Sequence, residues 1–262
     1  MKNFKLHYQM SLTFSHPIEQ HYFKLKCIPR DEAWQQATNM KVYVSADYFN
    51  YSEDGFNNRV LYGQKWNTHQ DIKVVVDADV HVDSTKLDKN EKLVALYRIA
   101  TKRTDVGESL GAWKDSIVFK EGMSDSEKTL FVMQSIHDAM SYVKGVTDLH
   151  TSAEAAFLKK EGVCQDYAQI MIAVLRSYGF PCRYVAGVME HEALTHAWVE
   201  VFFDRGWHGY DPTNLKLVDD SYVVFAHGRD AHDVYVNSGV FLGNDITQKQ
   251  DIQITLEEKT HE

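Results

Sequence analysis

Several stretches of alternating apolar and polar residues within about the first 85 residues constrain the fold of this chain more than any other feature. The apolar members between Lys5 and Ser15 are Leu6, Tyr8, Met10, Leu12 and Phe14. A period of two is typical of a β-strand with one buried face. The same alternation recurs from Phe23 to Cys27 and from Ile72 to Val82, with shorter pieces near 40–45 and 59–62. These strands, with a turn at Asp54-Gly55, predict an N-terminal antiparallel β-sandwich.

The periodicity changes from strand to helix spacing after Asp83-Ser84-Thr85. Apolar residues between 93 and 99 return at helical intervals, so we divide the chain into an N-terminal domain at 1–87 and a second domain at 88–262. Ser124 and Glu127 precede an amphipathic run and predict a capping box at a helix N-terminus. Thr151 and Glu154 repeat that spacing and predict a second, short helix that ends near Gly162.

A third helix is predicted to begin at Cys164 and to stop at Gly179, with Pro181 just beyond. The segments that follow it are rich in valine and aromatic residues, as strands are, and lie at 182–189, 194–203 and 206–211. Asp204-Arg205-Gly206 supplies the clearest turn between two of them. Helices followed by antiparallel strands predict an α+β fold for this part of the chain.

Composition excludes several classes of function. Lysine and arginine total 28 against 37 aspartates and glutamates, and the formal net charge of -9 disfavours binding to nucleic acid or to an anionic membrane. No apolar run is long enough to cross a bilayer, and the first residues lack the apolar stretch of an export signal. Three cysteines, an odd number, give no disulfide framework, so we expect a cytoplasmic protein.

Cys164, His196 and Asp211 are the residues with the strongest chemical signal. Unpaired N–H groups and the helix dipole favour the ionised form of a thiol at a helix N-terminus. One acyl-transfer unit consists of a thiol nucleophile, an imidazole that carries its proton and a carboxylate that orients the imidazole. If the chain turns at Asp204-Arg205, Asp211 lies opposite Trp198 and diagonal to His196, within side-chain reach on one sheet face.

The motifs around these residues resemble the core of the bacterial transglutaminase-like superfamily. The resemblance rests on Gly162-Val163-Cys164-Gln165-Asp166-Tyr167-Ala168, Pro181-Cys182-Arg183-Tyr184-Val185, His196-Ala197-Trp198 and Asp211-Pro212-Thr213-Asn214. It extends to Gly228-Arg229-Asp230 near the end of the chain, and to Phe14, Pro17 and Asp54-Gly55-Phe56 in the N-terminal strands. Cys182 and Ala231-His232 depart from the family pattern without touching the three central residues.

This resemblance implies a papain-like transglutaminase core preceded by the β-sandwich. It also implies that Cys164 is the nucleophile, His196 the general base and acid, and Asp211 the orienting carboxylate. The backbone N–H of Cys164 is the first expected donor to the oxyanion; Tyr142 and His150 are candidates for the second donor, which the sequence leaves open. Asp166 is expected to turn away from the thiol and to bind backbone, because a carboxylate beside it would oppose ionisation.

Other polar and aromatic residues have simpler interpretations. Cys27 and Cys182 fall on apolar strand faces and are expected to be structural. Trp198 either shelters the imidazole or fills the core, and Arg229 with Asp230 is expected to form a structural ion pair. His191 and His196 are five residues apart in a strand context, which does not fit the zinc-binding helix motif. We therefore predict neither a metal nor another cofactor.

The leading hypothesis is a cysteine-dependent hydrolase that cleaves amide or peptide bonds in a protein or peptide substrate. A transglutaminase, which passes the acyl group to an amine, shares every motif and remains an alternative. A non-catalytic protein-binding module with the same fold is the rival from another class. The sequence leaves open the substrate's identity, the role of the N-terminal domain and the oligomeric state.

Overall fold

The N-terminal strands form an antiparallel sheet around one long strand. The structure is a computed structural model that describes residues 1–90 and 92–259. Strand β1 (Lys2–Leu25) alternates buried and outward-facing side chains from Phe4 to Leu12, as its period of two predicts. The neighbouring strands are β2 (Gln35–Val44), β3 (Tyr48–Glu53), β4 (Arg59–Lys65) and β5 (His69–Val82), and the expected turn lies between β3 and β4.

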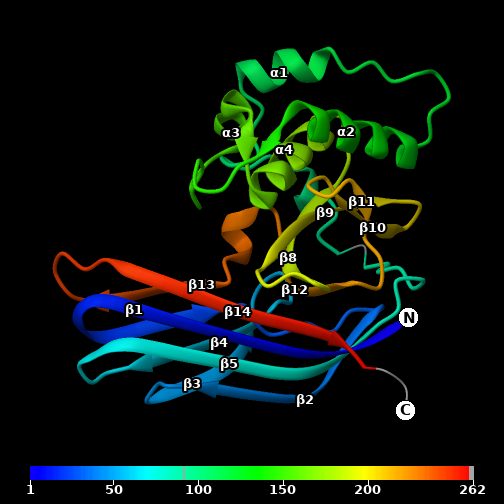
Figure 1. Cartoon of the computed structure of the whole chain (residues 1–262). Helices are drawn as coiled ribbons and strands as arrows, with labels where there is room; N and C mark the ends of the chain where they lie inside the picture. The colour runs from blue at the N-terminus through cyan, green and yellow to red at the C-terminus, as the bar shows by residue number, and fades with distance from the viewer. Residues whose placement is uncertain (91, 260–262) are drawn as a thin grey trace.

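Two strands from the other end of the chain complete this sheet. Residues 2–14 of β1 pair with β5 on one side and with β14 (Gln248–Glu258) on the other. Residues 19–25 of β1 pair with β4 and with β13 (Asn237–Leu242). Residues 237–258, which the division at 88 grouped with the second domain, therefore lie beside the first strand (Figure 1). The division into two domains stays a prediction.

Helices of the second part begin where polar side chains cap them. Ser124 and Glu127 form the predicted capping box, with Ser124 accepting from the N–H of Glu127 and Glu127 accepting from the N–H of Ser124. Gly179 has a φ of +89°, the left-handed conformation that often follows a helix end. The helices are α1 (Glu108–Asp115), α2 (Asp125–Ala139), α3 (Ala153–Lys159) and α4 (Cys164–Ser177).

A second antiparallel sheet lies between these helices and the N-terminal sheet. Its strand order is β11-β10-β9-β8-β12, and strand β8, between β9 and β12, is buried along its whole length. One face packs on the helices and the other on the N-terminal sheet, where the rings of Tyr8 and Phe225 meet edge to face at 5.9 Å. The strands are β8 (Cys182–Met189), β9 (His196–Phe203), β10 (Gly206–Asp211), β11 (Lys216–Leu217) and β12 (Tyr222–Gly228).

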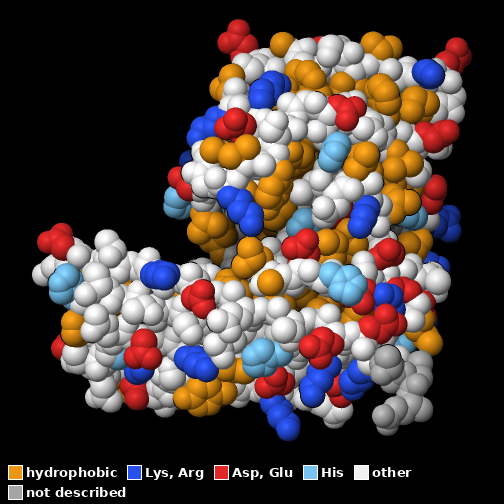
Figure 2. Space-filling view, in the orientation of Figure 1, with side chains coloured by type: hydrophobic (Ala, Val, Ile, Leu, Met, Phe, Trp, Pro, Cys, Tyr) orange, Lys and Arg blue, Asp and Glu red, His pale blue; other side chains and the backbone are white. Residues whose placement is uncertain are grey.

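The structure confirms the α+β class, with an N-terminal antiparallel sheet followed by helices and a second sheet. The two sheets share one hydrophobic core, because apolar side chains of β8, β9 and β12 join those of β1 and β5. The far half of the N-terminal sheet projects beyond the helices and gives the molecule an L-shaped outline (Figure 2). Among the described residues, no helix is both long and apolar enough to span a membrane.

Two expectations for local structure were wrong. The segment from 93 to 99 contains only a short 3-10 helix, η1 (Leu96–Arg98), because its backbone serves tertiary contacts: the carbonyl of Tyr97 accepts from Arg176 Nε at 2.8 Å. Glu154 does not take part in a capping box with Thr151. Ser152 is the N-cap of α3, and the Glu154 carboxylate accepts from the N–H groups of Ser109 and Leu110 in α1.

Candidate functional site

Cys164 is the first residue of α4, and the segments around it fix where that helix begins. Strand β7 (Glu161–Gly162) pairs in parallel with β6 (Ser141–Tyr142) immediately before it. The Asp166 carboxylate accepts from the Val163 N–H at 2.8 Å and from Thr147 Oγ1 at 2.7 Å, so it binds backbone as expected. A Cβ on Gly162 would lie 2.6 Å from that carboxylate, which explains the glycine. Burial raises the pKa of Asp166.

The hairpin of β9 and β10 brings His196 and Asp211 together. Asp204 and Arg205 adopt φ values of 49° and 62°, as a two-residue turn between twisted strands requires. Pairing of Val199 with Tyr210 confirms the predicted register. His196 Nε2 lies 2.7 Å from Asp211 Oδ2, so the predicted contact between imidazole and carboxylate is present.

Asp211 is fully buried and accepts hydrogen bonds at both oxygens. Oδ1 accepts from the N–H groups of Thr213 and Asn214 at 3.0 and 3.2 Å. Oδ2 accepts from Asn214 Nδ2 at 2.8 Å and from the Tyr222 hydroxyl at 2.9 Å, in addition to its contact with His196. Burial opposes ionisation, but these hydrogen bonds hold the pKa of Asp211 below its usual range. Sequence reasoning did not identify Asn214 and Tyr222 as its partners.

The His196 ring interacts with the core residue Trp198 and with the Cys164 thiol. Trp198 is fully buried and its ring stacks on that of His196, with centroids 6.3 Å apart, so it both fills the core and covers the imidazole. Gly187, the cross-strand neighbour of His196, leaves room for the indole, because a Cβ there would lie 2.6 Å from it. Burial lowers the pKa of His196, but hydrogen bonds and charge from Asp211 and Cys164 raise it to about 10.

Cys164 and His196 both line a groove of about 370 Å³ between the helical part and the N-terminal sheet. One wall comes from the segment that follows α2, with Tyr142, Lys144 and Leu149. A further part of the lining comes from residues that sequence reasoning did not assign to the site: Ala231, Val234, Tyr235, Val236, Asn237, Gln250 and Ile252. The N-terminal sheet therefore borders the thiol through β13 and β14.

The two candidates for a second oxyanion donor lie in different places. Tyr142 lines the groove, and burial together with the nearby Cys164 raises the pKa of its hydroxyl. His150 is not among the lining residues, and its Nδ1 lies 3.2 Å from Arg103 Nη2. Its position in the groove therefore favours Tyr142 over His150 as the candidate for the second oxyanion donor.

Comparison with known proteins agrees with this architecture. Residues 112–212 match the transglutaminase-like superfamily, and residues 4–81 match the bacterial transglutaminase-like N-terminal region. The chain belongs to the transglutaminase-like superfamily. A solved structure from Cytophaga hutchinsonii, described as a "putative cysteine protease", superimposes with a TM-score of 0.83 over 100% of this chain and 92% of that one. At 18% sequence identity this likeness shows the fold alone.

Two curated relatives from mycobacteria carry the description "Uncharacterized protein". A protein of Mycobacterium leprae (strain TN) is 34% identical over 128 residues, which are 45% of this chain and 44% of that protein. A protein of Mycobacterium tuberculosis (strain ATCC 25618 / H37Rv) is 33% identical over 135 residues, which are 45% of this chain and 43% of that protein. The matches thus span less than half the length of these relatives.

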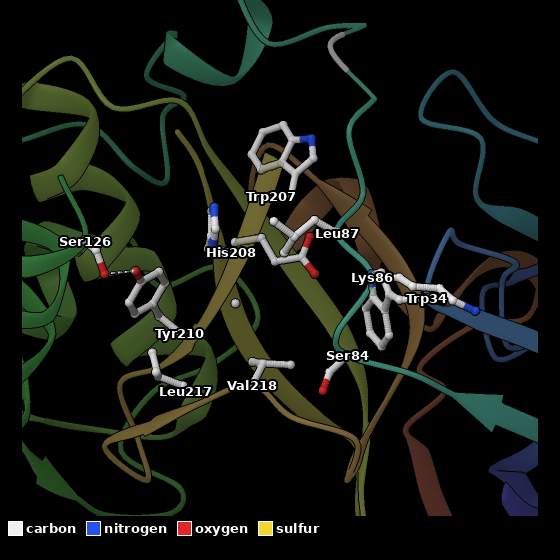
Figure 3. A pocket seen from close by; sticks show the side chains of 12 residues that line it. Trp34, Ser84, Lys86, Leu87, Ser126, Trp207, His208, Tyr210, Leu217 and Val218 are labelled. Carbon is white, nitrogen blue, oxygen red and sulfur yellow. Dashed lines mark hydrogen bonds between the residues drawn. The ribbon is translucent and has the colours of Figure 1, made fainter. Parts of the chain in front are cut away.

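A second, smaller cavity lies apart from the Cys164 groove. It holds about 210 Å³ where residues 84–87 cross β10, and none of Cys164, His196 and Asp211 lines it (Figure 3). Two of its polar groups have protein partners: the Tyr210 hydroxyl lies 3.3 Å from Ser126 Oγ, and Glu200 pairs with Arg183. His208 also lines the cavity, and its buried Nε2 has no hydrogen-bond partner among the described residues.

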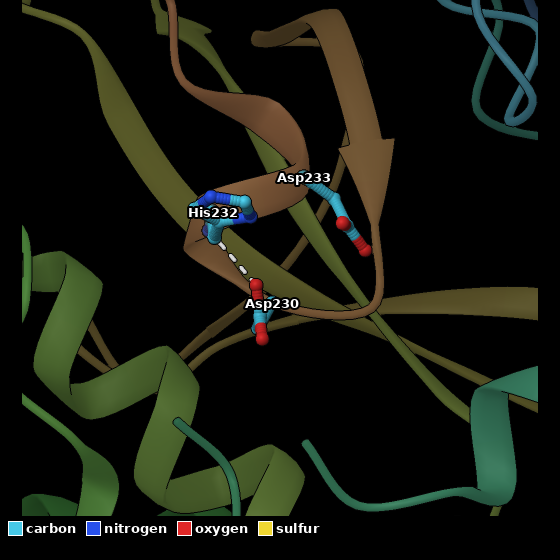
Figure 4. A group of neighbouring side chains, drawn as sticks. All are labelled: Asp230, His232 and Asp233. Carbon is cyan, nitrogen blue, oxygen red and sulfur yellow. Dashed lines mark hydrogen bonds between the residues drawn. The ribbon is translucent and has the colours of Figure 1, made fainter. Parts of the chain in front are cut away.

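Asp230, His232 and Asp233 cluster at the 3-10 helix η2 (Ala231–Val234), in a geometry that a cation fits (Figure 4). Both carboxylates already accept from protein donors. Asp233 accepts from Arg229 Nε and Nη2 at 2.8 and 3.0 Å, and Asp230 from Thr101 Oγ1 at 2.5 Å. The expected pair of Arg229 with Asp230 was wrong, because η2 turns Asp233 toward the guanidinium. Independence from metal stays a prediction.

Proposed function

We propose that this protein is a cysteine-dependent hydrolase that cleaves amide or peptide bonds through a thioester on Cys164. The observation that carries the proposal is the His196 imidazole, which bonds to the buried Asp211 at 2.7 Å and faces Cys164 in the groove. Asp211 would hold one tautomer of the ring and stabilise its cation. The general architecture is that of the superfamily, and the specific reaction is our proposal.

The reaction proceeds in two steps. The Cys164 thiolate attacks the amide carbonyl carbon, the C–N bond breaks, and the amine leaves with a proton from the His196 imidazolium. The acyl group remains on sulfur as a thioester. Water then gives a proton to His196, attacks the thioester carbon and breaks the C–S bond, which releases a carboxylic acid and restores the thiolate.

The oxyanion formed in each step needs hydrogen-bond donors. The N–H of Cys164 belongs to the first turn of α4 and has no partner within the helix, so it is available to the oxygen. The hydroxyl of Tyr142 is the second donor in this proposal, because β6 holds it beside the strand that leads into Cys164.

The charge of the groove favours water over a lysine side chain as acceptor of the acyl group. Lys144 contributes a positive charge to the lining, and no described lining residue is an aspartate or a glutamate. Lys144 would repel a cationic amine at this part of the lining. Transamidation therefore ranks second to hydrolysis.

Turnover of a panel of peptide amides tests the proposal. Cys164→Ala should abolish turnover and leave the circular dichroism spectrum unchanged, while Cys27→Ala, which alters a buried cysteine outside the groove, should retain activity. Incorporation of a labelled amine in preference to hydrolysis would assign a transglutaminase instead. If no substrate turns over and iodoacetamide labels Cys164 no faster than free cysteine, the non-catalytic binding module is the better description.

A further inference from the structure

One edge of β14 is free beside the groove. β14 pairs with β1 along residues 248–258, and no strand of the described chain pairs with its other side. Gln250 and Ile252 of this strand line the same groove as Cys164. Figure 1 shows β14 along the side of the N-terminal sheet that faces β8 and η2. An unpaired edge presents a row of N–H and C=O groups that another extended chain can bind.

Another part of the groove's rim exposes large apolar side chains. Tyr142 is 50% exposed, Leu149 is 56% exposed and Leu194 is 49% exposed, and all three line the groove. Apolar side chains gather where the helical part meets the N-terminal sheet (Figure 2). Exposed apolar groups grouped around a candidate site are typical of a binding surface.

We propose that the substrate is an extended polypeptide segment that adds a strand to the free edge of β14 and places a large apolar side chain against Tyr142, Leu149 and Leu194. The inference rests on the proposed function, because it places that segment across Cys164. Main-chain hydrogen bonds to β14 would give affinity, and the apolar rim would give specificity, as in other cases of strand addition.

This arrangement selects a class of substrate. Successive side chains of an added strand point to opposite faces, so every second residue of the substrate would face the apolar rim. Its backbone N–H groups also alternate between pairing with β14 and pointing away. Flexible loops and termini of proteins can meet both conditions, whereas a small amide without neighbouring residues can meet neither.

Binding to the Cys164→Ala protein tests the inference separately from catalysis. The probes are fluorescein-labelled octapeptides of glycine and serine that carry phenylalanine, leucine, aspartate, lysine or glycine at one central position, measured by fluorescence anisotropy. We expect the phenylalanine and leucine peptides to bind at least about 10-fold more tightly than the others, since a buried side chain of this size contributes that much. Methylation of single backbone nitrogens of the peptide should weaken binding at every second position, where the N–H pairs with β14, and not at the positions between.

Leu149→Ser and Leu194→Ser should each remove most of the preference for phenylalanine. Leu217→Ser is the matched control, because Leu217 is 55% exposed and does not line the groove. Equal binding of all peptides, or N-methyl effects without alternation, would overturn the inference even if the wild-type protein hydrolyses a small activated amide. The expected binding pattern without turnover by the wild-type protein would overturn the proposed function and leave the inference standing.

Discussion

Replacing Asp211 by asparagine should separate the role of the buried carboxylate from that of the thiol. Burial lowers the pKa of His196, and hydrogen bonds and charge from Asp211 and Cys164 outweigh that effect and raise it from the ordinary value of 6.5 to about 10. In Asp211→Asn the charge is lost while burial remains, so the pKa of His196 should fall sharply. We expect kcat/KM to drop by about 100- to 10,000-fold.

The assay is the pH dependence of kcat/KM and of iodoacetamide labelling of Cys164. In the wild-type protein the imidazolium is kept as pH rises until about 10, so activity should decline only through that value. In Asp211→Asn the decline should begin at a lower pH. The free energy of unfolding should change with pH in the same direction. The stabilisation that comes from the raised pKa of His196 is complete below pH 6.5 and is lost as pH rises through about 10.

Asp88→Asn is the control for loss of a buried carboxylate, since Asp88 is 7% exposed, pairs with Arg183 and lies outside the groove. It should lower stability without moving the alkaline decline in activity. Asp211→Asn should also unfold at lower urea concentration, because an amide nitrogen at either position meets at least two donors. An unchanged alkaline decline in a folded Asp211→Asn protein would refute the reasoning.

Three further perturbations have definite expected outcomes. Tyr142→Phe should lower kcat about 100- to 1,000-fold with little change in KM if the hydroxyl donates to the oxyanion, and steady-state kinetics would show it; an unaltered kcat would exclude that role. Asp166→Ala should reduce the free energy of unfolding by about 1–3 kcal/mol, measured in urea, because it removes the bond to the Val163 N–H. Burial lowers the pKa of His21 to about 4, so the stability associated with its neutral ring is complete above pH 6.5 and is lost as pH falls toward 4. Urea titrations of His21→Gln should show weaker pH dependence over that range than the wild-type protein, and equal pH dependence would contradict the assignment.

Local features of the site were predictable from sequence because short-range chemistry determines them. The two-residue turn at Asp204-Arg205 fixes the β9–β10 register, and that register decides which side chains share a face with His196. The start of α4 at Cys164 follows from the residues just before it and from Asp166. These two elements carry all three residues of the proposed catalytic unit.

Features that depend on distant segments were not predictable in the same way. Strand β14 carries mostly polar residues, so its pattern did not indicate pairing with β1, although Lys5 pairs with Glu257, 252 residues later in the chain. Leu93, Leu96 and Tyr97 have helical spacing, but Leu93 takes a φ of 64° and Tyr97 uses its carbonyl to bind Arg176. In both cases tertiary contacts outweigh local propensity.

The pairing of β1 with β13 and β14 has a consequence for biosynthesis. Residues 237–258 supply one wall of the groove and cover one edge of the first strand. A nascent chain whose Cys164, His196 and Asp211 have already emerged from the ribosome would still lack that wall. If substrates bind by strand addition as proposed, long peptides should bind only after residues 237–258 have left the ribosome and paired with β1.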